Sequence, residues 1–184
     1  ENSKYYAVGC DDGLTELIFA ENINGHSYEI LAHAFRGRTG ITKVEFTEGI
    51  SAIGDYAFYD CDSLTGVTFQ SGVTYIGDYA FYGCTALTTL AFGDSAPSIG
   101  NYAFYECNVL VIDSFPVSLE TVGEKAFYNC KGLTAINLPA IKSIGKFAFK
   151  GCTGMESVTL NEGLISIGES AFENLNIKGD LVIP

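Results

Sequence analysis

Hydrophobic positions recur along this chain with a period of about 23 residues. The phrase IGDYAFYDC begins at Ile53, and variants of the phrase begin at six further residues: Ile30, Ile76, Ile99, Val122, Ile144 and Ile167. When this Ile or Val is counted as position 0 of a unit, all seven units carry Ala-Phe at positions 4 and 5. Self-similarity at a fixed period of this length indicates a stacked-repeat architecture.

Each unit combines two kinds of apolar spacing. Positions 11, 14 and 16 are apolar, as in Leu64, Val67 and Phe69, and the alternation of positions 14 and 16 is typical of a half-buried β-strand. Positions 1, 4, 5 and 8 hold Gly, Ala, Phe and Cys, a spacing that places them on one face of a helical turn. Each unit is therefore predicted to form one short strand and one tight helical or 3₁₀ turn. The unit that begins at Ile99 departs from the pattern, because Asp113 replaces the apolar residue at position 14.

A unit of this size cannot bury its own apolar face, so it must stack on its neighbours. The pattern predicts one solenoid domain over residues 1–184, with a parallel β-sheet on one face and short turns on the other, in about eight coils. Residues 1–29 are predicted to form a degenerate N-terminal coil, residues 30–166 six regular repeats, and residues 167–184 a last, truncated repeat.

Glycine recurs at position 1, in Gly54, Gly77, Gly100, Gly123, Gly145 and Gly168. This repetition predicts a backbone that needs either a positive φ or a close approach at that position. A phosphate-binding loop is the functional alternative, but no lysine follows at the required spacing.

Cysteine recurs at position 8, in Cys61, Cys84, Cys107, Cys130 and Cys152, and Cys10 has a similar place in the first coil. Equivalent residues in adjacent coils lie about 4.8 Å apart and point the same way. A relaxed disulfide needs Cβ atoms about 3.8 Å apart. We therefore expect a column of buried free thiols that act as small hydrophobic side chains.

The charge balance excludes several classes of partner. The 184 residues include 22 acidic and 10 basic side chains, which gives a formal net charge of −12. A nucleic-acid binder needs a basic face, as does a protein that docks on anionic lipid. The longest aliphatic run covers residues 109–112, far fewer than the roughly 20 residues that span a bilayer. We expect neither a nucleic-acid partner nor insertion into a membrane.

The sequence offers no convincing catalytic centre. His26, His33 and Cys10 fall in the irregular first coils, and nothing in their spacing orients a nucleophile toward a base. The carboxylates are scattered over many units, whereas a catalytic centre needs unlike groups that converge on one pocket. Asp60 and Asp62 match no calcium-loop pattern. We expect no catalytic residue, no cofactor and no metal.

The series Cys-x-x-Leu-x-x-Val-x-Phe/Leu, followed by Val/Ile-x-x-Ile-Gly-x-x-Ala-Phe, resembles the BspA-like leucine-rich repeat class. The resemblance covers nearly the whole chain, with departures at Leu31, Arg38 and Leu175. It implies a leucine-rich-repeat solenoid in a bacterial or protist protein that is secreted or on the cell surface. Members of the class are associated with adhesion to host extracellular-matrix proteins and with co-aggregation of cells. The class carries no catalytic residue set.

Two repeated surfaces are candidates for binding. Positions 3 and 6 lie on the side of the turn away from Ala and Phe. They hold seven of the eleven tyrosines: Tyr56, Tyr59, Tyr79, Tyr82, Tyr102, Tyr105 and Tyr128. Stacked coils would align these rings in two columns, and tyrosine is a common interface residue. The alternative is that the rings stack on one another and merely shield the core.

The second surface is the outward side of the predicted strands, at positions 13 and 15. Its residues include Thr68, Thr89, Ala91, Ser114, Asn137 and Thr159. These small, uncharged side chains suit the close approach of an extended protein segment, but they include no aromatic or arginine anchor. The alternative is an ordinary solvated sheet.

These observations favour a non-enzymatic binding or adhesion module whose partner is a protein of the host extracellular matrix or of a cell envelope. The alternative is a structural spacer or self-associating stalk without a dedicated ligand. Either further sequence in a parent protein or self-association is expected at the C-terminal edge, because the strand around Leu181 and Ile183 has no polar capping coil. The chain begins at Glu1 rather than at Met, so we expect that a leader or a larger parent has been removed. The resemblance implies that the protein is extracellular or on the cell surface.

Overall fold

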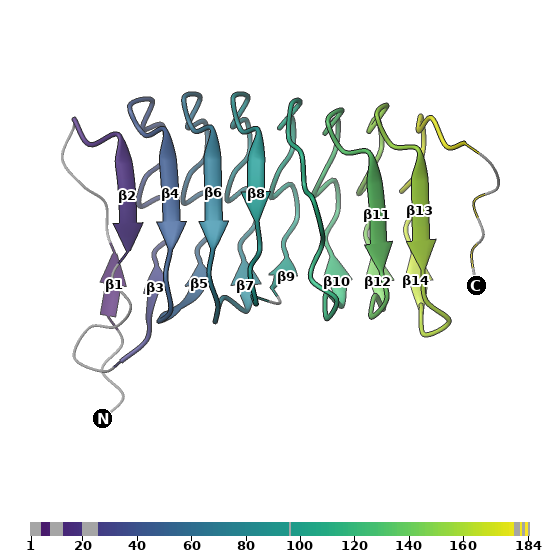
Figure 1. Cartoon of the computed structure of the whole chain (residues 1–184), viewed down its shortest axis with the longest axis horizontal. Helices are drawn as coiled ribbons and strands as arrows, with labels where there is room; N and C mark the ends of the chain where they lie inside the picture. Colours follow the sequence, from purple (N-terminus) through teal and green to yellow (C-terminus); the bar gives the residue numbers. More distant parts are fainter. Residues whose placement is uncertain are drawn as a thin grey trace.

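The computed structural model is a solenoid whose coils lie side by side along the long axis of the molecule (Figure 1). The structure describes residues 5–7, 13–19, 26–95, 97–178, 181 and 183. Neighbouring coils are joined by parallel strand pairs in matching register, for example Val44 opposite Val67 and Val67 opposite Leu90. The predicted solenoid with a parallel sheet is confirmed.

One set of strands, sheet 1, comes from positions 13 to 16 of the units. It contains β2 (Glu16–Phe19), β4 (Lys43–Phe46), β6 (Gly66–Phe69) and β8 (Thr89–Ala91), and separately β11 (Ala135–Leu138) paired with β13 (Ser157–Leu160). The predicted alternation is present, since Val67 and Phe69 are buried whereas Thr68 is exposed. Sheet 1 therefore has an inner apolar side and an outer polar side.

A second parallel sheet, sheet 2, adds a strand per unit that the sequence pattern did not predict. Its eight strands are β1 (Tyr5–Ala7), β3 (Tyr28–Ile30), β5 (Ile50–Ile53), β7 (Tyr75–Ile76), β9 (Ser98–Ile99), β10 (Thr121–Val122), β12 (Ser143–Ile144) and β14 (Ser166–Ile167), in that order. From β5 to β12 the Ile or Val at position 0 is buried. The residue before the glycine thus anchors sheet 2 in the core.

The turns between sheet 2 and sheet 1 are not helical, because the described part of the chain contains no helix. Positions 3 and 7 have positive φ, as at Tyr56 (57°) and Asp60 (53°), and a right-handed helix requires negative φ throughout. The N–H groups at positions 4, 6 and 8 close turns within the unit, whereas those at positions 3, 5 and 7 donate to the next coil. The prediction of about eight coils is not confirmed either, since complete turns number about six.

The glycine at position 1 is required by a close approach between coils. A Cβ atom at Gly77 would lie 2.6 Å from the backbone N of Asp55 and 2.7 Å from the backbone C of Gly54. None of the position 1 glycines has a positive φ. Of the two explanations that the sequence left open, the close approach is confirmed.

The phenylalanine at position 5 forms a continuous stack through the core. Neighbouring ring centroids lie 5.0–5.7 Å apart from Phe35 to Phe172, and the rings from Phe58 to Phe149 are fully buried. Each inner ring therefore packs against one ring on either side.

The cysteine at position 8 lies beside this stack. The Sγ atom of Cys84 donates to the carbonyl oxygen of Phe58 at 3.2 Å, and the other four described cysteines make the equivalent contact at 3.0–3.3 Å. All five are buried free thiols, as predicted, whereas Cys10 lies outside the described residues.

We expect these five thiols to resist alkylation in the folded protein. Burial raises the pKa of Cys61 to about 11 and that of Cys152 to about 12, so at about pH 8 almost none of either is the reactive thiolate. Mass spectrometry after iodoacetamide treatment, without reductant, should show five more labelled cysteines in denaturant than in buffer. Labelling of these sites in buffer would contradict their burial, and resistance in denaturant would indicate cross-links.

The unit at residues 99–121 interrupts sheet 1. Val111 lies opposite Thr89 of β8, so Ile112 takes the inward place and is buried. The expectation that Asp113 replaces the inward apolar residue is therefore wrong, because the apolar series has shifted by one residue and Asp113 is exposed. Between β8 and β11 the described chain forms no strand of sheet 1, and Figure 1 shows it crossing this interval as irregular chain.

The C-terminal edge is described only at Leu181 and Ile183, since Val182 and Pro184 lie outside the described residues. Self-association through that edge stays a prediction.

Candidate binding surfaces

The turns bring the seven predicted tyrosines together in two adjacent columns, which we call the tyrosine face: Tyr56, Tyr79 and Tyr102 in one column, and Tyr59, Tyr82, Tyr105 and Tyr128 in the other. Within a column, ring centroids lie 4.7–4.9 Å apart and ring planes are inclined by 2–9°. Across the columns, rings of the same coil lie 5.7 Å apart. All seven side chains are half-buried. The alignment expected from stacked coils is confirmed.

The backbone beneath the rings is fixed by bonds between coils. The N–H of Tyr56 donates to the carbonyl of Asp78 at 2.9 Å, and the N–H of Tyr102 donates to the carbonyl of Glu124 at 2.7 Å. Because neighbouring rings cover one another's faces, the columns present mainly ring edges and hydroxyl groups to solvent.

Other residues at the same unit positions cap the columns. The His33 ring stacks on Tyr56 at 4.9 Å, and the Arg36 guanidinium carbon lies 4.8 Å from the centroid of Tyr59. At the other end, Lys125 Nζ lies 4.9 Å from the centroid of Tyr102. Cations over ring faces are attracted by the π-electrons. Sequence reasoning missed these caps, although their places at positions 3 and 6 were a usable signal.

The hydroxyl groups of Tyr79, Tyr82 and Tyr105 are protonated at neutral pH. Partial burial raises the pKa of Tyr79, Tyr82 and Tyr105, and nearby carboxylates raise it further. For Tyr82 these carboxylates are Asp60 and Glu106. Each hydroxyl can therefore both donate and accept a hydrogen bond.

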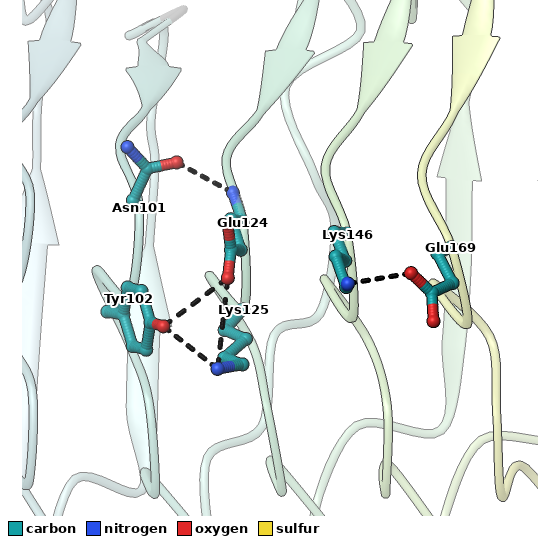
Figure 2. Close-up of polar contacts among 6 residues, drawn as sticks. All are labelled: Asn101, Tyr102, Glu124, Lys125, Lys146 and Glu169. Atoms are coloured by element: carbon teal, nitrogen blue, oxygen red, sulfur yellow. Dashed lines mark hydrogen bonds and ion pairs between the residues drawn. The ribbon is translucent and has the colours of Figure 1, made fainter.

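A ladder of side chains at position 2 runs beside the tyrosines. Asp55 Oδ1 accepts from the N–H of Asp78 at 2.8 Å, and Asp78 Oδ1 accepts from the N–H of Asn101 at 2.7 Å. Asn101 Oδ1 accepts from the N–H of Glu124 at 2.8 Å (Figure 2). Aspartate and asparagine thus perform the same structural task in successive coils.

Charge pairing differs between the two halves of this surface. In the C-terminal half, Glu124, Glu169 and Glu173 pair with Lys125, Lys146 and Lys150 at 3.7, 2.6 and 2.9 Å. In the N-terminal half, five carboxylates make no ion pair with any described residue: Asp55, Asp60, Asp62, Asp78 and Glu106. The tyrosine face is consequently flanked by carboxylates that make no ion pair within the described chain, although Arg36 acts on Asp60 electrostatically.

The six residues predicted for the outer side of sheet 1 are all exposed, and the structure groups five of them in two hollows. Ser114, Asn137 and Thr159 line a hollow of about 400 Å³ beside the interrupted part of the sheet. Thr68 and Thr89 line another of about 220 Å³, and Ala91 lines neither. The hollows suit this face to contact with another molecule, but Phe115, which lines the larger hollow, is buried and presents no exposed aromatic anchor.

Sequence reasoning missed these hollows for two reasons. The smaller one lies at Gly66, whose neighbours at the same unit position are Lys43 and Thr89, and the absent side chain leaves the space open. The larger one depends on the shift of register before Phe115, which the unit spacing does not reveal.

The described residues include no group of three His, Cys, Asp or Glu side chains arranged to hold a metal ion. They also contain no helix with the length and apolar character needed to cross a membrane.

Comparison with solved structures finds bacterial proteins of the same architecture. A leucine-rich repeat protein from T. pallidum is 27% identical with a TM-score of 0.77, and the match covers 86% of this chain and 75% of that one. A leucine-rich cell surface protein from Faecalibacterium prausnitzii is 21% identical, with a TM-score of 0.58 and coverage of 94% and 42%. A leucine-rich repeat protein from Bacteroides ovatus is 24% identical, with a TM-score of 0.58 and coverage of 92% and 51%. The chain therefore spans about half the length of the last two proteins.

A search of curated proteins gives no significant match. The sequence pattern of the BspA type leucine-rich repeat region, by contrast, matches in six copies over residues 10–114 and 79–184. Together with the stacked coils and the repeated Ala-Phe turns, this match shows that the chain belongs to the BspA-type leucine-rich repeat family.

Proposed function

We propose that the chain is a non-enzymatic binding module of a bacterial cell surface or secreted protein, and that it recognises a protein partner through the tyrosine face. The observation that carries the proposal is the pair of continuous, half-exposed tyrosine columns on a backbone locked by bonds between coils. Rigid tyrosines supply contact area at a small loss of conformational entropy. A cell surface protein among the structural neighbours supports the location.

Repetition also supports adhesion as the role. Each coil presents the same pair of rings, so a partner with several contact points gains avidity without any deep pocket. Proteins of the extracellular matrix or of a cell envelope present such extended surfaces. The alternative is a spacer or self-associating stalk, in which the rings serve only to cover the core.

Replacing Tyr79, Tyr82, Tyr102 and Tyr105 together by serine is expected to weaken capture at least about tenfold, which is about 1.4 kcal/mol. Serine occurs naturally at position 3 with positive φ, at Ser170, so the backbone tolerates it. Binding is measured by surface plasmon resonance against purified matrix and envelope proteins, with circular dichroism as the check on folding. The matched control replaces the same four residues by phenylalanine, which keeps the stacks.

The opposite face provides the competing test. Bulky replacements at Thr68, Ala91 and Ser114 obstruct the outer side of sheet 1 and leave the tyrosines intact. Loss of capture in these variants alone would place the contact on sheet 1. Unfolding of the serine variant would show that the rings serve to cover the core, and it would favour the spacer.

A further inference from the structure

The chain itself shows how the tyrosine face holds a cation. Lys125 Nζ donates to the hydroxyl oxygen of Tyr102 at 2.9 Å and lies 3.7 Å from Oε1 of Glu124. The same tyrosine hydroxyl donates to Oε1 of Glu124 at 3.3 Å, so the three groups close a ring of polar contacts (Figure 2). A tyrosine from one coil and a carboxylate from the next together form this seat for an ammonium group.

The backbone pairing of a tyrosine with an acidic residue of the next coil recurs without a lysine. The backbone bond that joins Tyr102 to Glu124 has its counterpart between Tyr56 and Asp78, two coils earlier. Asp78 belongs to the unit whose position 3 holds Tyr79, where the next unit but one has Lys125. This turn therefore supplies no ammonium group beside Tyr56 and Asp78. Asp78 makes no ion pair with any described residue.

The second column carries unpaired charge in the same way. Asp60 and Asp62 flank its N-terminal end, and Asp60 and Glu106 lie close enough to Tyr82 to influence it electrostatically. Because the stacked rings cover one another's faces, an incoming cation would meet hydroxyl and carboxylate oxygens, as the Lys125 ammonium does. These oxygens are strong acceptors for charged donors.

We propose that the partner of the tyrosine face is a basic protein surface, whose lysine and arginine side chains bind between the tyrosine hydroxyls and the unpaired carboxylates of the N-terminal half. This inference rests on the proposed function and names the chemistry of its partner. The formal net charge of −12 would speed association with such a partner and make binding weaken as salt rises.

The test neutralises three carboxylates without altering shape, in the variant Asp55→Asn, Asp60→Asn, Asp78→Asn. Asparagine already occupies position 2 at Asn101 and position 7, with positive φ, at Asn129. The fold is therefore expected to survive. The matched control, Glu48→Gln, Asp113→Asn, Glu162→Gln, removes the same charge from exposed sites away from the tyrosine face.

The probe is a fluorescent peptide of alternating lysine and serine, with an arginine-serine peptide and a glutamate-serine peptide for comparison. Fluorescence anisotropy should show binding of both basic peptides and no binding of the acidic one. The tyrosine-face variant should bind the basic peptides at least about fivefold more weakly, as expected when several exposed charge contacts are lost. The affinity of the control variant for the basic peptides should change less than about twofold.

An equal loss of affinity for the basic peptides in the two variants would overturn the proposal. It would show that the peptides are attracted by the net charge of the protein rather than by the tyrosine face. The proposed function has a separate outcome. If a purified partner is captured through the tyrosines but equally well by the neutralised variant, the tyrosine face binds proteins and the assignment of a basic partner is wrong.

Discussion

Replacing Phe81 with alanine is expected to lower the free energy of unfolding by about 3–5 kcal/mol, the usual range when a large aromatic side chain is removed from a packed core. The ring is fully buried and lies between those of Phe58 and Phe104, with centroids 5.2 Å away on either side. Its loss leaves a cavity and removes two stacking contacts at once. Urea denaturation followed by circular dichroism measures the change.

The controls are the same substitution nearer the ends of the stack. Phe172 is partly exposed and, among the described residues, stacks on Phe149 alone, at 5.7 Å, so its replacement should lower the free energy of unfolding clearly less. We also expect Phe35→Ala to be milder, because the first coils pack on fewer regular neighbours. In a solenoid, stability is a sum over adjacent coils. Equal losses at all three positions would contradict that description.

Replacing Gly123 with alanine is expected to destabilise the protein by about 3 kcal/mol or more, at the upper end of overpacking effects. A Cβ atom there would lie 2.5 Å from the backbone C of Gly100 and 2.7 Å from the backbone N of Asn101. Backbone atoms cannot rotate away as a side chain can. The two coils must therefore separate, and the strand pairing of sheet 2 weakens with them.

Gly66→Ala is the matched control, since it adds the same methyl group to a strand glycine. Its nearest neighbours would be Thr89 Oγ1 at 3.1 Å and Lys43 Cγ at 3.9 Å, both in side chains that can move. Gly66 has no positive φ, so alanine causes no backbone strain there. The free energy of unfolding should therefore change by no more than about 1 kcal/mol. A loss at Gly66 as large as that at Gly123 would show that coil contact is not the cause.

The parts of the fold that depend on burial were predictable from the sequence. Phe58, Cys61 and Val67 recur at fixed intervals because each must face the same core in every coil, and the structure buries all three. Sheet 2 was not predicted because most of its strands have two or three residues, too few to show an alternation. The turns were predicted to be helical because the spacing of their apolar residues fits both a helical turn and the non-helical turns that the structure contains. Gly, Asn or Asp, the residues most tolerant of positive φ, occupy position 7 in every unit except the one with Glu106, and they were the signal against a helix.

The candidate site was predictable to the same extent. Alignment of Tyr79 with Tyr102 follows from the repeat alone, since any residue at position 3 must lie beside its equivalent in the next coil. The seat around Lys125 was not predicted, because Glu124 contributes to it from position 2, whereas Tyr102 and Lys125 both occupy position 3. The hollow beside Asn137 depends on an irregular segment for which the repeat supplies no template.

The interruption of sheet 1 has a mechanical consequence. Sheet 2 runs without a break through all eight of its strands, whereas sheet 1 is divided between β8 and β11. A solenoid with one continuous sheet and one interrupted sheet bends most easily at the interruption. The solenoid should therefore flex at this one coil, with sheet 2 as the hinge line, and behave as two stiff segments joined by a compliant joint. Such a joint would allow the molecule to adjust its curvature to a partner while the stacking within each segment remains intact.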